Sequence, residues 1–202
     1  MMNIRFRSVR LVALAVSLLA SVVSLRVSNA TPVTLRTVAL TDDTAPGAVA
    51  GQNFSQFSQI TLDASGNTVF QGFTNDGSTG QSGIWRENGG SLGIEALSGD
   101  AAPGIGAGVT FSSFLNGVQG NNGIFGYNAE VTGTGITTGS NDRVVYRDTG
   151  SGPTVVARRG DVAPGTAGGE IFTDLVAKQM NASGAMVLFG ETSAAVDNVG
   201  LW

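Results

Sequence analysis

The side chains that could do chemistry in this chain are carboxylates and arginines. Its 202 residues include no histidine and no cysteine, which removes the commonest general base, the commonest zinc ligand and any disulfide. A glycosidase needs two carboxyl groups about 5–9.5 Å apart across the sugar. The candidates are the neighbours Asp42 and Asp43, the pair Glu87 and Asp148, and the pair Asp100 and Asp161. All of them recur with a repeat or lie in turn sequences, so we expect no catalytic residue among them.

The tripeptide Arg159-Gly160-Asp161 has the sequence that animal integrins read. The same place in two earlier phrases holds Ser98-Gly99-Asp100 and Thr41-Asp42-Asp43, so the aspartate recurs and the arginine does not. Asp and Gly suit turns, because Asp can bond its own backbone and Gly accepts a positive φ. We therefore predict a structural turn here rather than an adhesion site.

Two further groups of polar residues have the composition of functional sites. Clustered oxygen side chains at Asn75-Asp76-Gly77-Ser78 and at Asn141-Asp142 are of the kind that bind calcium, but neither has EF-hand spacing. Ordinary polar loops have the same composition, so no cofactor is predicted and calcium stays an option. Arg86 and Arg147 follow Trp85 and Tyr146 at matching places, which predicts a structural role for both arginines.

An internal repeat positions these residues. TDDTAPG at 41–47, SGDAAPG at 98–104 and RGDVAPG at 159–165 are copies of one phrase, whose prolines lie 57 and 61 residues apart. The residues predicted to form the repeat motif are Asp43, Pro46, Phe54, Gly66 and Phe70, then Asp100, Pro103, Phe111 and Gly123, then Asp161, Pro164, Phe172, Asn181 and Gly184. A fixed period indicates that each copy is one supersecondary unit that stacks on its neighbours.

Within one unit the apolar residues alternate with polar ones between turn signals, a pattern typical of strands. In the first unit it predicts strands near 54–62, 67–74, 82–88 and 92–99. Thirty glycines, about twice the usual share of ~7%, fit many tight turns. The predicted fold is all-β, with tandem four-stranded antiparallel units in a partial or three-unit β-propeller-like arrangement. The units cover roughly residues 43–99, 100–160 and 161–202.

The two ends of the repeat region are out of phase with whole units. Residues 33–41 match the fourth strand of a preceding unit, and the last unit has only its first three strands, near 172–180, 185–191 and 198–202. Three units are fewer than the four to eight blades usual in propellers. We expect a piece of a longer protein; a complete three-unit fold and a ring closed by dimerisation are the alternatives.

Residues 1–30 have the features of a signal peptide that precedes the β-repeat domain 31–202. Three arginines come before an apolar run of 15 residues, Leu11–Leu25, which is shorter than the ~20 residues of a membrane-spanning helix. The small residues Ser28 and Ala30 lie just before Thr31, so cleavage is predicted between Ala30 and Thr31. We expect a signal helix, export, and a mature part without membrane insertion, located outside the cell or on its surface.

The charge of the mature part narrows the range of partners. The segment 1–30 holds four of the eleven basic residues and none of the fifteen acidic ones, which leaves a formal net charge of −8. Such a chain repels phosphate backbones and anionic lipid heads, so nucleic acid and membrane surfaces are not expected partners.

The phased residues resemble a family of exported bacterial proteins described as tandem repeats containing NxxGxxAF, with one of several C-terminal anchors. Asn181-Ala-Ser-Gly184 matches the first half of that motif, and Asp63-Ala-Ser-Gly66 followed by Val69-Phe70 matches it with Asp for Asn and Val for Ala. The second copy, around Gly123, keeps only a glycine and an aromatic end. The resemblance covers nearly all of the mature chain. It implies export and cell-surface display, and no activity of particular residues.

Together these features predict an exported, non-enzymatic surface or matrix repeat module with a binding or structural role. Its partner would be a glycan or a protein that the sequence does not identify, and the sequence does not give the oligomeric state. The alternative is a propeller-type extracellular carbohydrate-active hydrolase or lyase. An enzyme of that kind should have acidic or arginine residues that break the period and converge on the central channel.

Overall fold

The protein consists of antiparallel β-sheets in the part that its computed structural model describes, which is residues 35–202 without 78, 116–118, 122 and 197. Every helix or strand assigned there is a strand, which confirms the all-β prediction. In that same part no helix is long and apolar enough to cross a membrane. The predicted signal segment 1–30 lies outside the described residues. All three sheets belong to the compact unit Thr37–Trp202.

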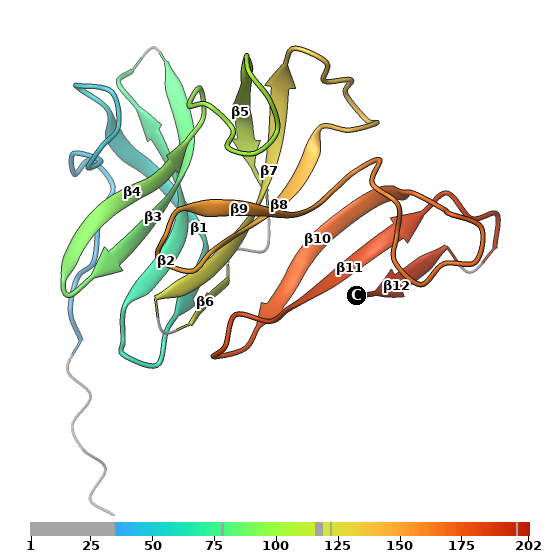
Figure 1. Ribbon diagram of the computed structural model, residues 1–202. Coiled ribbons are helices and arrows are strands. Elements are labelled where there is room, and N and C mark those ends of the chain that lie inside the picture. The colour runs from blue at the N-terminus through green and yellow to red at the C-terminus, as the bar shows by residue number, and fades with distance from the viewer. Residues whose placement is uncertain (1–34, 78, 116–118, 122, 197) are drawn as a thin grey trace, which may run out of the picture. The chain divides into compact units, whose positions relative to one another are not determined.

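The sheets follow one another along the chain, and each is a meander of neighbouring strands (Figure 1). The first contains β1 (Asn53–Leu62), β2 (Thr68–Asn75), β3 (Gly80–Asn88) and β4 (Ser91–Leu97). The second contains β5 (Val109–Phe114), β7 (Ile124–Gly133), β8 (Arg143–Asp148) and β9 (Pro153–Arg158), with the short β6 (Gln119–Asn121) paired to β7. The third contains β10 (Phe172–Met180), β11 (Met186–Thr192) and β12 (Val199–Leu201).

The strands expected in the first unit are formed, with ends within two residues of the predicted ones. The turn between β3 and β4 shows why: Gly89 and Gly90 have φ of +59° and +87°, which a two-residue hairpin turn requires at both places. The first strand of each sheet carries a register shift at the same place, after Phe54, Phe111 and Phe172. A bulge that recurs in three strands belongs to the repeat unit itself.

The leading strand predicted at 33–41 is not formed: residues 35–40 have no regular structure, and 33 and 34 lie outside the described part. A strand needs a neighbour to bond, and the described chain offers this segment none. The third sheet has three strands, as the phase predicts. The described sheets do not form a closed propeller.

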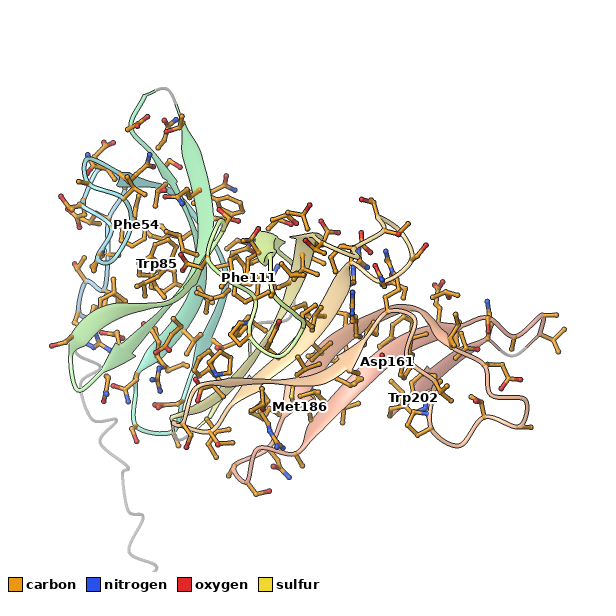
Figure 2. The ribbon with its side chains drawn as sticks, turned by 45° about the horizontal axis from the view of Figure 1, so that its top comes forward. Phe54, Trp85, Phe111, Asp161, Met186 and Trp202 are labelled. Atoms are coloured by element: carbon orange, nitrogen blue, oxygen red, sulfur yellow. The ribbon has the colours of Figure 1, made fainter. Side chains whose placement is uncertain are left out.

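Each sheet contains the same aromatic arrangement at its core. The first-strand phenylalanine meets the third-strand aromatic edge to face, and Figure 2 shows Phe54 beside Trp85. The ring centroids are 4.9 Å apart for Phe54 and Trp85, 5.5 Å for Phe111 and Tyr146, and 4.9 Å for Phe172 and Trp202. Such pairs add roughly 0.5–1.5 kcal/mol to the free energy gained by burying the rings.

The turn phrase is fastened to that core through its proline. The carbonyl oxygen of the proline accepts a hydrogen bond from the third-strand aromatic. The pairs are Trp85 Nε1 to Pro46 (2.9 Å), Tyr146 Oη to Pro103 (3.0 Å) and Trp202 Nε1 to Pro164 (2.8 Å). In the first two sheets the proline's carbonyl oxygen thus satisfies the polar group of a fully buried side chain, Trp85 or Tyr146.

Neighbouring sheets pack face to face through apolar residues and a few polar side chains. Val69, Ile84 and Ala96 of the first sheet share one cluster with Phe111 and Tyr127 of the second. Val145 and Ala157 of the second sheet share another with Phe172, Leu175 and Leu188 of the third. The two junctions therefore use equivalent positions of the repeat.

Candidate functional site

The aspartates of the repeated phrase cap their own turns. Each accepts, through Oδ2, the backbone N–H three residues before it. The bonds join Leu40 to Asp43 (3.0 Å), Leu97 to Asp100 (3.2 Å) and Arg158 to Asp161 (2.8 Å). Asp161, the aspartate of the Arg-Gly-Asp sequence, therefore has the same local bond as its two counterparts.

The carboxylates Glu87 and Asp148 are also engaged in local structure. Both are buried at equivalent ends of β3 and β8. Glu87 Oε2 accepts the backbone N–H of Thr68 at 3.0 Å and its hydroxyl at 2.6 Å. Asp148 Oδ1 accepts the backbone N–H groups of Gly150 and Gly152, at 2.6 and 3.2 Å. Both carboxylates therefore hold local backbone structure at the ends of their strands.

The hairpin turn after the first strand is built by the Asp or Asn of the NxxG sequence. Asp63 Oδ1 accepts the N–H groups of Ser65 and Asn67, at 2.8 and 2.9 Å. Asn181 Oδ1 accepts those of Ser183 and Ala185, at 3.0 and 2.9 Å. Burial acts to raise the pKa of Asp63, but the bonds from Asn67 and Ser65 outweigh it and lower that pKa. Asp63 thus serves as a turn acceptor.

The glycine of that turn takes part in the junction between sheets. Arg86 Nη1 donates to the carbonyl oxygen of Gly123 at 3.0 Å, and Arg147 Nη1 donates to that of Gly184 at 3.3 Å. The side chain of each arginine thus extends from its own sheet to the hairpin turn of the next sheet. This contact gives the structural role that the repeat predicts for the two arginines.

In the two loops considered for calcium, side-chain oxygen atoms accept hydrogen bonds from backbone N–H groups of the same loop. Asn75 Oδ1 accepts the N–H of Gly77 and Asp76 Oδ1 that of Thr79, while Ser78 lies outside the described residues. Asn141 Oδ1 accepts the N–H of Thr137. Among the residues that the structure describes, no three aspartates or glutamates gather closely enough to hold a metal ion.

A charged network at the junction of the second and third sheets breaks the repeat. Arg143 at the start of β8 pairs with Asp174 of β10 and, at 3.3 Å, with Glu130 of β7. Arg159, after β9, pairs with Asp142 at 2.8 Å and with Asp174 at 3.3 Å. At the preceding junction, the positions of Arg143, Arg159, Asp142 and Asp174 hold Ser82, Ser98, Gln81 and Ser113. These charges are therefore particular to one junction.

The network borders a hollow of about 280 Å³ beside β10. Arg143 and Asp174 form its polar wall, while Leu115, Val176 and Phe189 supply apolar surface. Lys178 lies at the rim with its ammonium 5.4 Å from the centroid of the Phe189 ring. The volume lies just below the roughly 300–1,000 Å³ of small-molecule sites.

Asp142 and Asp174 both pair with arginines of this network. Burial acts to raise the pKa of Asp142, but the N–H of Gly139 and the Arg159 guanidinium together lower it below its ordinary value. Asp174 is shared by two guanidinium groups, and its side chain is still 42% exposed. The Asp174 carboxylate is held by both guanidinium groups and is partly exposed, so it can accept a hydrogen bond from a hydroxyl group.

The sequence named only part of this site. Arg159 was assigned to a structural turn and Asp142 to a polar loop considered for calcium, and Arg143, Asp174 and Glu130 were not singled out. Aligning the three repeat units would have found Asp174, because the equivalent position holds Ser113 in the second unit and Gln56 in the first. A charged residue that occurs in one repeat unit, where the other units have uncharged polar residues, points to a site rather than to a structural role.

The fold and the site define an all-β tandem-repeat protein with one charged junction between sheets. The chain belongs to a family of unknown function, DUF7453, whose profile matches residues 20–202. No curated protein and no solved structure matches it.

Proposed function

We propose that this protein is an exported, non-enzymatic surface or matrix module whose stacked repeats bind a glycan in the hollow beside β10. The observation that carries the proposal is the charged network around Arg143 and Asp174, which departs from the repeat at one junction only. Structural residues recur with the period, and a binding site need not.

The repeated contacts support a propeller-like arrangement of the sheets. A unit of four antiparallel strands, stacked on the next unit through equivalent faces, is the plan of a propeller blade. The first strand of such a blade lies nearest the central channel. The hollow borders β10, the first strand of its sheet, so in this arrangement it opens towards that channel.

The residues of the hollow suit a carbohydrate better than a charged ligand. Sugars present hydroxyl groups along their edges and apolar C–H surfaces on their faces. Asp174 and Arg143 offer an acceptor and a donor, and Phe189 and Val176 offer apolar contact. The arginines are already neutralised by carboxylates, which leaves little net charge to attract an anion.

Export and surface display rest on the sequence. The signal-like segment 1–30 and the resemblance to exported NxxGxxAF repeats both support them. If the protein is exported, protein recovered outside the cytoplasm should start at Thr31, as N-terminal sequencing or intact-mass measurement would show.

A glycan array tests the binding proposal directly. The full protein should be retained on one class of glycan, and Asp174→Asn and Lys178→Gln should each weaken that retention at least tenfold. The matched control is Gln179→Ala, an exposed change on the same strand, which should bind like the original protein. Equal retention of all four proteins would place the ligand elsewhere and overturn the assignment of this hollow.

The alternative is a propeller-type hydrolase or lyase. Charges that break the repeat are also expected of such an enzyme, and two carboxylates, Asp174 and Glu130, pair with the same arginine. Such an enzyme would shorten a polysaccharide, and replacing one catalytic carboxylate would abolish the cleavage. We expect the purified protein to leave polysaccharides intact.

A further inference from the structure

The two methionines that follow residues 1–30 lie together where the second and third sheets meet. Met180 ends β10 and Met186 begins β11, and the two residues are paired across the hairpin (Figure 2). The equivalent positions of the other two units hold no sulfur: they are Leu62 and Thr68 in the first unit, and Gln119 and Phe125 in the second. The sulfur atoms, like the charged network, are therefore particular to this junction.

The methyl groups of both methionines pack on a glycine of the second sheet. Gly126 of β7 is buried, and a Cβ atom on it would lie 2.6 Å from Met186 Cε and 3.2 Å from Met180 Cε. The two methyl groups thus occupy the space that a side chain would need. Met186 also packs against the apolar cluster that the second and third sheets share. The pair therefore belongs to the packing between these sheets.

Two hydrogen bonds that join the same sheets flank this contact. Asn128, two residues after Gly126, accepts the backbone N–H of Ala177 at 2.8 Å. Arg147, which is paired with Gly126, donates to the carbonyl oxygen of Gly184 at 3.3 Å. A change that moves the methionines away from Gly126 therefore also acts on both of these bonds.

The two thioethers are open to small reagents. Met180 and Met186 are both partly exposed, and together with Gln179 and Val187 they border a hollow of about 200 Å³. A hydrogen peroxide molecule is far smaller than this hollow. The chain has no cysteine, so methionine is the sulfur that a peroxide meets.

We propose that Met180 and Met186 form an oxidation site, at which a peroxide loosens the junction between the second and third sheets. A lone pair of the sulfur attacks one oxygen of hydrogen peroxide, so that an S=O bond forms and the O–O bond breaks. The sulfur is oxidised, and the peroxide is reduced because its other oxygen leaves as water with both hydrogens. The product is a sulfoxide, which is polar and chiral where the thioether was apolar.

The sulfoxide oxygen does not suit the surroundings of Gly126. The polar atom nearest to the two methyl groups there is the carbonyl oxygen of Tyr146, 2.9 Å from the same Cβ position. A sulfoxide oxygen accepts hydrogen bonds and donates none, so it gains nothing from that carbonyl. A buried acceptor without a donor is destabilising. The oxidised side chains therefore turn towards water, and the sheets lose this contact.

The effect on binding rests on the function proposed for the hollow beside β10. That hollow lies between the same two units, with Leu115 and Arg143 from the second and Asp174 and Lys178 from the third. Met180 follows Lys178 by two residues on β10. Sheets that separate at the methionines also change the spacing of these two walls. Oxidation at this site therefore weakens glycan binding.

Urea unfolding of the full protein before and after hydrogen peroxide treatment tests the oxidation site without any glycan. Peptide mass mapping should show one added oxygen on Met180 and one on Met186, and the urea midpoint should fall by about 1 M. Methionine sulfoxide reductases should restore the original midpoint.

The matched control is Met180→Leu/Met186→Leu, which keeps Met1, Met2 and both tryptophans. Its midpoint should be the same with and without peroxide. Unmodified Met180 and Met186 after a treatment that fully oxidises free methionine would overturn the proposal. So would sulfoxides at both positions with an unchanged midpoint, or an equal fall in the control.

Glycan retention tests the effect on binding. The oxidised protein should bind the retained glycan class about tenfold more weakly, which is an ordinary strength of coupling between two sites. The Met180→Leu/Met186→Leu variant should bind equally with and without peroxide. Equal retention of the oxidised and untreated original protein would overturn the effect on binding. If the untreated protein retains no glycan, the proposed function fails, and the urea midpoints still decide whether the two methionines are the oxidation site.

Discussion

Asn128 is the side chain whose replacement should loosen the junction between the second and third sheets most selectively. It is fully buried on β7, and its Oδ1 accepts the backbone N–H of Ala177 on β10 at 2.8 Å. Gln71 at the same position of the first sheet donates to the carbonyl oxygen of Phe114 at 2.6 Å. Leu has the same branching at Cγ as Asn, with methyl groups in place of the amide oxygen and nitrogen, so Asn128→Leu removes the acceptor and leaves the Ala177 N–H buried without its partner.

The expected loss follows from that unpaired donor. A buried N–H that loses its partner costs about 1–3 kcal/mol, so unfolding of Asn128→Leu should require about 2 kcal/mol less than unfolding of the original protein. With a urea dependence of about 2 kcal/mol per M, the midpoint should fall by about 1 M at an unchanged slope. Urea unfolding followed by Trp fluorescence measures both quantities.

The control is Gln179→Leu, which makes the same kind of change at an exposed position of β10. Its free energy of unfolding should stay within about 0.5 kcal/mol of the original value. An Asn128→Leu midpoint equal to that of the original protein, or a Gln179→Leu midpoint equally low, would refute the claim that this buried amide joins the sheets.

Three further changes test other contacts, and urea unfolding measures all of them. Gly47→Ala should lower the free energy of unfolding by about 3 kcal/mol, because at φ +77° its new Cβ would lie 2.1 Å from Cγ2 of Ile94. The matched control Gly165→Ala has φ +81° and nothing within 4 Å of the new Cβ, so it should lower that free energy by only about 1 kcal/mol. Tyr146→Phe should cost about 1–2 kcal/mol, since the turn proline's carbonyl oxygen then loses its donor. Asp142 has a folded pKa below its ordinary 3.8, so it stabilises the fold above that value and loses this effect as pH falls through the lower folded pKa. Asp142→Asn should therefore lose less stability than the original protein between about pH 5 and pH 2, and equal losses would contradict the lowered pKa.

The strands could be predicted because their signals are local. Alternation of apolar and polar residues places β1 to β4 within two residues of their observed ends, and the glycines between them mark turns that need positive φ. The repeated proline phrase aligns the three units in the sequence. In the structure the bulge and the aromatic pairs occur at the same positions of each unit.

The segment before the first turn could not be placed in this way. Residues 35–40 have the pattern of a fourth strand but form none, because pairing depends on a neighbour that the pattern does not report. Local sequence predicts which residues can form a strand. It does not predict whether a partner is present.

The charged junction was only partly predictable for a related reason. Arg143 and Asp174 are 31 residues apart in sequence and meet because two sheets pack at one register. No motif spacing links either Arg143 or Arg159 to Asp174. A column-by-column comparison of the units would have identified the aspartate, since its counterparts Gln56 and Ser113 are uncharged.

The fate of a bound glycan tests the central claim most directly. The glycan class retained on the array would be incubated with the full protein and its length determined by mass spectrometry. The proposal of a non-enzymatic module predicts that the glycan is bound and recovered at its original length. A shortened product, formed by the original protein and lost with Asp174→Asn or Glu130→Gln, would contradict it and identify a carbohydrate-cleaving enzyme.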